Sequence, residues 1–115
     1  MNDNEISKIL AEFEFECEVE ITGNHVYKAN WTQEDFLNET REIASRYYLD
    51  DFNTILKLWN KLEVTNTKSE SLPNGNVKYS IGIFNGDLAC WADGEGKSIQ
   101  DAAINATVSM IQKIK

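Results

Sequence analysis

Ten consecutive residues near the amino terminus alternate strictly between glutamate and an apolar side chain. Successive side chains of a β-strand point to opposite faces, so a strand over 12–21 would bury every apolar side chain and expose every carboxylate. A helix would instead scatter the glutamates around its circumference. The alternation therefore predicts a strand whose carboxylates form a nearly straight line about 26 Å long. The residues of that line are Glu12, Glu14, Glu16, Glu18 and Glu20.

The residues on either side of this segment predict a helix before it and a strand after it. Apolar side chains recur at helical spacing over 6–13, which indicates a short amphipathic helix that opens the chain. A turn-like sequence at 22–25 precedes a second apolar stretch at 26–31. We therefore expect 26–31 to be the returning strand of a hairpin.

Two further helices and a loop are expected in the middle of the chain. Thr32 begins a capping box and is followed by apolar residues at helical spacing up to Tyr47. Asp50 or Asp51 would cap the next helix, which we expect to end near Glu63. The polar stretch over 65–76 predicts the one long loop.

An Asn-Gly pair at 85–86 is the strongest hairpin signal in the chain. It predicts a two-residue turn between two strands, and that turn would pair Ile83 with Leu88 on one face. The opposite face would carry Phe84 and Trp91, so both faces of this hairpin are partly apolar.

The last helix is expected to begin after Ser98, where a second capping box precedes small and apolar residues at helical spacing. Its alanines allow close approach to a sheet. The element order is α-β-β-α-α-β-β-α. That order predicts an α+β fold in which antiparallel β-hairpins pack with helices, in a single compact domain over residues 1–115.

Composition excludes several classes of protein. The chain has 115 residues, of which 42% are apolar, and its 19 acidic and 11 basic side chains give a net charge of −8. This is enough apolar material for a core, yet no uninterrupted apolar run approaches the roughly 18 residues of a membrane span. The amino terminus lacks the pattern of a secretory signal, and two cysteines cannot form a disulfide framework. We therefore expect a cytoplasmic protein with no membrane partner.

The residue types needed for catalysis or metal binding are scarce. His25 is the only histidine, and both cysteines are expected to face inward, so no Cys-His pair or tetrahedral metal site can be assembled. The segment 94–98 echoes the end of a phosphate-binding P-loop, but Trp91 stands where that motif needs an earlier glycine. The sequence predicts no enzyme, no cofactor and no metal site.

The carboxyl-terminal part resembles the final loop and helix of a double-stranded RNA-binding domain. The residues at that spacing are Gly94, Gly96, Ser98, Ala102 and Ala106. That family places consecutive lysines after the serine to contact phosphates, whereas Ile99 and Gln100 occupy those positions here. Because cations supply most nucleic-acid affinity, we expect no direct nucleic-acid binding.

A second resemblance covers 47–115 together with the opening helix around 6–12. The segment 48–53, Tyr-Leu-Asp-Asp-Phe-Asn, leads into a helix, then a hairpin with aromatic residues, then an alanine-containing helix. This order resembles the phage ABA-sandwich family, small α-β-α proteins of phages and prophages. The resemblance implies a mobile-element origin and supplies no catalytic residues.

The predicted glutamate line allows two interpretations. Outward charges keep an exposed strand from pairing with other chains. Alternatively, the line imitates a nucleic-acid phosphate backbone and occupies a basic groove of a host protein, with Phe84 and Trp91 as apolar anchors. The second interpretation predicts an acidic phage or prophage inhibitor of a host defence or nucleic-acid-binding protein, such as an anti-CRISPR, that acts by stoichiometric binding.

Two alternatives remain open. In the first alternative, the chain sequesters a small anionic signalling nucleotide. The site would be formed by Trp91, Gly94, Gly96, Lys97 and Ser98. In the other alternative it is an oligomeric accessory protein, for which a second copy of the chain, as in a homodimer, is the partner.

Overall fold

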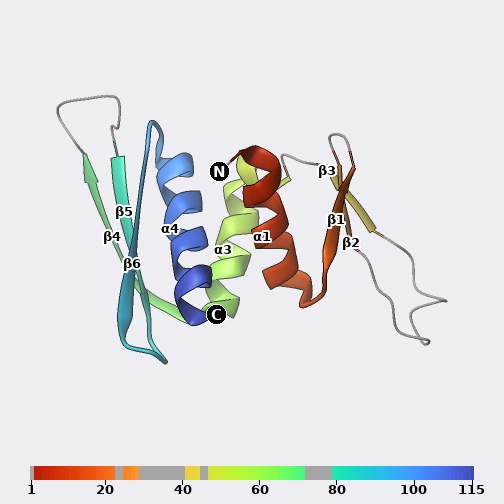
Figure 1. Ribbon diagram of the computed structural model, residues 1–115. Helices are drawn as coiled ribbons and strands as arrows, with labels where there is room; N and C mark the ends of the chain where they lie inside the picture. Colours follow the sequence, from red (N-terminus) through yellow and green to blue (C-terminus); the bar gives the residue numbers. More distant parts are fainter. Residues whose placement is uncertain (1, 23–24, 29–40, 45–46, 72–78) are drawn as a thin grey trace. The chain divides into compact units, whose positions relative to one another are not determined.

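The computed structural model describes residues 2–22, 25–28, 41–44, 47–71 and 79–115. The chain divides into two compact units, Met1–Tyr48 and Leu49–Lys115, each with helix and one antiparallel three-stranded sheet (Figure 1). The predicted α+β class is confirmed. The joining of both units into one domain over residues 1–115 stays a prediction.

The elements follow the predicted order with two strands added. The first unit contains α1 (Asp3–Phe15), β1 (Val19–Thr22), β2 (His25–Lys28) and β3 (Arg41–Ala44), and α2 (Tyr47–Asp50) spans the boundary. The second unit contains α3 (Phe52–Lys61), β4 (Val64–Ser71), β5 (Tyr79–Asn85), β6 (Cys90–Gly96) and α4 (Ile99–Ile114). The added strands are β3 and β4.

The first unit is built from α1 and the sheet β1-β2-β3. The side chain of Asn2 caps α1 by accepting from the amide of Glu5 at 2.8 Å. Leu10 and Ala11 of α1 are fully buried, and α1 contacts β1 and β2. These contacts give the opening helix a tertiary core to pack on.

The strand predicted over 12–21 is wrong for most of its length. Helix α1 continues to Phe15, Glu16 ends it in the left-handed conformation with φ 54°, and β1 begins only at Val19. The apolar stripe of the opening helix already includes Phe13, so the helical period extends into the alternating segment. Burial of that stripe outweighs the two-residue alternation, which a helix tolerates at its partly exposed end.

The helix predicted from Thr32 to Tyr47 is also wrong where the structure describes it. Arg41–Ala44 form β3, which pairs with β2 in the register Val26↔Ile43. Residues 32–40 lie outside the described residues. The short helix that precedes α3 begins at Tyr47, so pairing with β2 prevails over the helical spacing of the apolar residues.

The second unit places α4 across one face of the sheet β4-β5-β6, and α3 packs on α4 and on β4 (Figure 1). We call the covered face of this sheet the inner face and the opposite one the outer face. The inner face contributes Ile81, Ile83 and Ala92 to the core, all at most 5% exposed. The helices contribute Ile55, Leu58, Ala102, Ala103, Ala106 and Met110.

The close approach of α4 to the sheet depends on Gly94 of β6. A Cβ atom at this position would lie 2.0 Å from the amide nitrogen of Ala106 and 2.4 Å from the carbonyl oxygen of Ala102. Both atoms belong to the helix backbone and cannot turn aside. The helix alanines therefore pack against a glycine, as their small size predicted.

The loop predicted over 65–76 is wrong for 65–71, which pair with β5 as strand β4, while 72–76 lie outside the described residues. The residues of β4 from Thr65 to Ser71 are all exposed. A strand exposed on both faces lacks the apolar alternation that identifies a half-buried strand, so its polar sequence is typical of an edge strand.

The predicted two-residue turn at 85–86 is wrong. Asn85 pairs with Cys90 and Phe84 with Trp91, so the loop is Gly86–Ala89. The buried Asn85 side chain donates to the carbonyl oxygen of Leu62 at 2.7 Å and accepts from the amide of Leu88 at 2.8 Å. Asn85 therefore ends a strand, and Ala89 takes the left-handed conformation with φ 52°.

Tyr48 makes a buried polar contact within the first unit. It is 1% exposed, and its hydroxyl donates to the carboxylate of Glu14. Burial, and then the adjacent Glu14 carboxylate, raise the pKa of the Tyr48 hydroxyl above its ordinary value of 10.0, because both disfavour a phenolate.

We expect Tyr48 to lower the free energy of unfolding as the pH rises above about 10. Above about pH 10 the unfolded chain loses this proton while the folded chain keeps it, so the stabilisation is full below that pH and is lost above it. The free energy of unfolding of the wild type, relative to Tyr48→Phe, should fall by about 1 kcal/mol between pH 10 and pH 11, because half of the unfolded chains have already lost this proton at pH 10. Urea unfolding at both pH values measures this difference, and a difference that stays constant contradicts the assignment.

Candidate functional site

The outer face of the sheet β4-β5-β6 presents three rows of side chains, one residue from each strand. The pairing register and the alternation of strand side chains define these rows. They are Asn66, Phe84 and Trp91, then Lys68, Gly82 and Asp93, then Glu70, Ser80 and Glu95. Helices α3 and α4 both lie on the inner side of this sheet (Figure 1).

The first row carries an aromatic pair of which Trp91 is exposed. The rings of Phe84 and Trp91 have centroids 5.1 Å apart and an interplanar angle of 50°. Trp91 is 37% exposed, while Phe84 is half-buried. The structure thus confirms that both residues share one face. A large aromatic group in contact with solvent on a rigid sheet is typical of a binding anchor.

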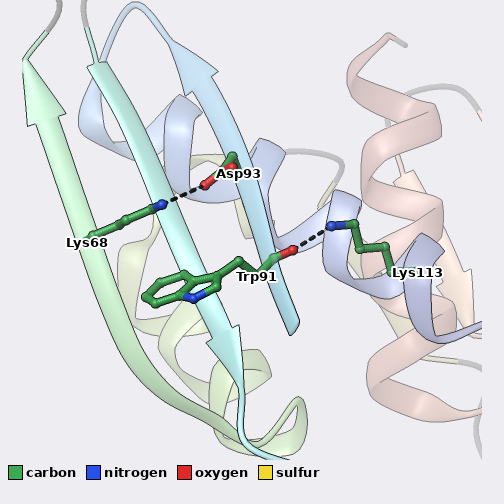
Figure 2. Close-up of polar contacts among 4 residues, drawn as sticks. All are labelled: Lys68, Trp91, Asp93 and Lys113. Atoms are coloured by element: carbon green, nitrogen blue, oxygen red, sulfur yellow. Dashed lines mark hydrogen bonds and ion pairs between the residues drawn. The ribbon is translucent and has the colours of Figure 1, made fainter. Parts of the chain in front are cut away.

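The second row holds a cation against the indole ring. The Lys68 side chain reaches from β4 across β5 toward β6 (Figure 2). Its Nζ lies 4.8 Å from the centroid of a Trp91 ring and 3.8 Å from Oδ1 of Asp93. A Cβ atom on Gly82 would lie 2.5 Å from Lys68 Cε, so the absence of a side chain at Gly82 leaves the path for Lys68.

The backbone of Trp91 is fixed from the helix side. The Lys113 ammonium of α4 donates to the carbonyl oxygen of Trp91 (Figure 2). The neighbouring Cys90 places its Sγ 4.0 Å from Sδ of Met110, also on α4. Strand β6 lies at an edge of the sheet β4-β5-β6, so a side chain of α4 can reach its backbone. These contacts hold the backbone of Trp91 in place before any partner binds.

Charge is unevenly distributed along the chain. Met1–Tyr48 has 11 acidic and 4 basic side chains, a net charge of −7, whereas Leu49–Lys115 has 8 and 7, a net charge of −1. The outer face is more acidic than its unit, because Glu70, Asp93 and Glu95 accompany one cation, Lys68, in its three rows. Such a face attracts cationic rather than phosphate groups.

The five predicted partner-binding glutamates do not form a line. Glu12 lies on α1 with its carboxylate 3.8 Å from Lys8, and Glu14 on the same helix accepts from Tyr48. Glu16 ends the helix, Glu18 lies just before β1, and only Glu20 lies within that strand. The mimicry of a phosphate backbone by a straight row of carboxylates therefore loses its structural basis, because the row is divided between a helix, its cap and a strand.

The predicted nucleotide site is not assembled either. Trp91 lies on the outer face, whereas Gly94 packs against α4 on the inner face. A Cβ atom on Gly96 would likewise meet the amide of Ala102 at 2.7 Å. The Ser98 hydroxyl caps α4 by accepting from Asp101. Gly94 and Gly96 thus serve helix-to-sheet packing.

Sequence reasoning found Phe84 and Trp91 but missed Lys68, Gly82 and Asp93. These three residues come from three strands, and the polar sequence of β4 predicts a loop. The sequence feature that indicates a strand there is the pair of β-branched residues Thr65 and Thr67 in the segment that forms β4.

Two other classes of site find no support within the described residues. No group of three or more His, Cys, Asp or Glu side chains among them is placed to hold a metal ion. Of the helices that the structure describes, none combines the length and apolar character needed to span a membrane.

Comparisons with known proteins concern the fold. No protein-family model matches the chain, and no curated protein matches its sequence. The fold is similar to that of a phage protein from Bacillus cereus ATCC 14579 in a 2.0 Å crystal structure. The two chains are 15% identical with a TM-score of 0.61, and the similarity covers 96% of this chain and 92% of the other.

Proposed function

We propose that this chain is a non-catalytic phage or prophage protein that binds a host protein with a basic surface through its outer face. It would act by stoichiometric inhibition of a host defence or nucleic-acid-handling protein, as an anti-CRISPR does. The exposed Trp91 ring, which packs on the half-buried Phe84, is the observation that carries this proposal. The similarity to the Bacillus cereus phage protein supports the phage origin.

The chemistry of the outer face favours a protein partner. An aromatic anchor whose backbone is already fixed loses less entropy in a complex, and Lys113 holds the backbone of Trp91. The carboxylates beside the anchors would complement a basic surface.

The acidic first unit has a different role in this proposal from the one predicted. With no straight row of glutamates, its net charge of −7 would act at long range and raise the association rate with a cationic partner. Steering of this kind needs net charge and no particular arrangement of carboxylates.

We expect Trp91→Ala to abolish partner capture while leaving the fold intact. The immobilised wild type and variant are each exposed to host lysate, and proteins retained by the wild type alone are identified. Leu88→Ala is the matched control, because Leu88 is 57% exposed in the loop of the same hairpin and lies outside the three rows. Against the purified partner, loss of a central aromatic anchor should weaken binding about 30-fold or more, since it removes about 2 kcal/mol or more.

Ionic strength provides a second test of the same complex. The association rate should fall as salt rises from low to moderate concentration, because steering is screened over about a Debye length of 10 Å at 0.1 M. The proposal is wrong if Trp91→Ala and Leu88→Ala capture the same proteins with equal affinity. It is also wrong if Trp91→Ala changes only self-association in light scattering, since the partner is then a second copy.

A further inference from the structure

We propose that the outer face recognises an arginine side chain of its protein partner, and that this arginine displaces Lys68 from Trp91 and Asp93. This inference rests on the proposed function, because it names the chemical group that the same face would bind. In the free protein Lys68 then serves as an internal substitute for the partner's cation.

Lys68 is held loosely. Its Nζ lies 3.8 Å from Oδ1 of Asp93, beyond the roughly 2.7–2.9 Å of a direct hydrogen bond between a cation and a carboxylate. The side chains of Lys68 and Asp93 are 56% and 60% exposed, so solvent screens their attraction. An incoming cation therefore has little binding energy to overcome when it replaces Lys68.

The two groups that Lys68 contacts, the Trp91 ring and the Asp93 carboxylate, suit a guanidinium better than an ammonium. A guanidinium is planar, stacks on an indole ring and donates two parallel hydrogen bonds to a carboxylate, whereas an ammonium acts as a point charge. Trp91 and Asp93 are two residues apart on β6 and share the outer face, which places them about 6.6 Å apart along the strand. One arginine side chain can contact both.

The surface between them has the shape for a flat side chain. Gly82 leaves the sheet without a side chain at this point, and a Cβ atom there would lie 2.7 Å from Oδ1 of Asp93 and 2.5 Å from Lys68 Cε. The third row adds the carboxylates of Glu70 and Glu95 on the same face. Once Lys68 moves aside, three carboxylates and an aromatic ring remain, which favours an arginine over a phosphate or an acidic peptide.

A titration with a small arginine derivative tests this without knowledge of the partner. N-acetyl-arginine N-methylamide is added to the ¹⁵N-labelled full chain, and the indole and amide resonances of Trp91, Gly82 and Asp93 are followed. We expect saturable shifts at these residues, weaker binding of the lysine derivative, and loss of binding in Asp93→Asn. Lys68→Met keeps the apolar stem and removes the competing charge, so it should bind the arginine derivative about three- to tenfold more tightly than the wild type.

The controls separate this inference from the proposed function. Leu88→Ala should titrate as the wild type does, and Lys68→Met should unfold at the wild-type temperature. The inference is overturned if the arginine derivative produces no saturable shift in either wild type or Lys68→Met, or if Lys68→Met binds it no more tightly. It is likewise overturned if a partner that depends on Trp91 binds Lys68→Met more weakly, because Lys68 is then itself a contact; the proposed function survives that result.

Discussion

Replacing Gly94 by alanine should destabilise the second unit by about 3 kcal/mol or more, and replacing it by valine should leave that unit unfolded. The added Cβ would lie 2.0 Å from the amide nitrogen of Ala106 and 2.4 Å from the carbonyl oxygen of Ala102. These atoms belong to a helix whose other contacts fix its position, so α4 must move away from the sheet. Urea unfolding followed by circular dichroism measures the loss.

Gly82 provides a matched control for this prediction. It is also a buried glycine of the same sheet, but a Cβ atom there would meet the Lys68 side chain and the Asp93 carboxylate, which can turn aside. Gly82→Ala should therefore keep the wild-type stability to within about 1 kcal/mol. If Gly94→Ala and Gly82→Ala proved equally stable, the account of the close helix-to-sheet contact would be wrong. Gly82→Ala would also place a methyl group in the path of the Lys68 side chain, so this variant also alters the outer face.

The elements that sequence reasoning predicted well are those with a strong helical stripe or a helix cap. Helix α3 begins after Asp51, whose side chain accepts from the amide of Asn53 at 2.9 Å, and α4 begins after Ser98 as its capping box predicts. Both helices bury a stripe of apolar side chains. In these segments local capping and tertiary burial favour the same structure.

The segment from Glu12 to Glu16 shows how two periodic patterns compete. Its alternation fits a strand, but Phe13 also completes the apolar stripe that begins in the first turns of α1. Burial of Leu10 and Ala11 decides in favour of the helix, and the sequence offers no measure of that burial. The predicted mimicry of a phosphate backbone loses its basis with the strand, because a straight line of these carboxylates requires a strand over the whole segment.

The outer face illustrates a different limit. Phe84 and Trp91 could be placed on one face although the predicted turn is two residues too short, because lengthening a turn by two residues leaves the facing of the alternating side chains unchanged. The contact of Lys68 with Asp93 joins residues 25 positions apart, and Lys68 lies on the edge strand β4, whose sequence is almost wholly polar. Its register is set by backbone pairing with β5, so only the three-stranded arrangement brings the charged and aromatic groups together.

Asn85 ends β5 where the sequence predicts a turn. Asn85→Asp should lower the free energy of unfolding by about 3 kcal/mol or more near pH 7. The substitution keeps the acceptor for the Leu88 amide but replaces the donor to the Leu62 carbonyl oxygen, 2.7 Å away, with a carboxylate oxygen at a site that is 5% exposed. Asn85→Ala removes both hydrogen bonds and no charge is buried, so its cost should be smaller, about 2 kcal/mol.

The pH dependence of the free energy of unfolding distinguishes the loss of a hydrogen-bond donor from the loss of packing at Asn85. Burial beside a carbonyl would raise the pKa of the carboxyl group introduced by Asn85→Asp above its unfolded value of about 4, because the neutral acid can donate to Leu62 as the amide did. The cost of Asn85→Asp relative to the wild type should therefore be small below about pH 4, grow as the pH rises from there to the folded pKa and level off above it, whereas that of Asn85→Ala should stay constant. Urea unfolding of the three proteins near pH 3.5 and pH 7 measures both differences. If Asn85→Asp cost the same at both pH values, the hydrogen bond to Leu62 would not be what fixes this corner of the sheet.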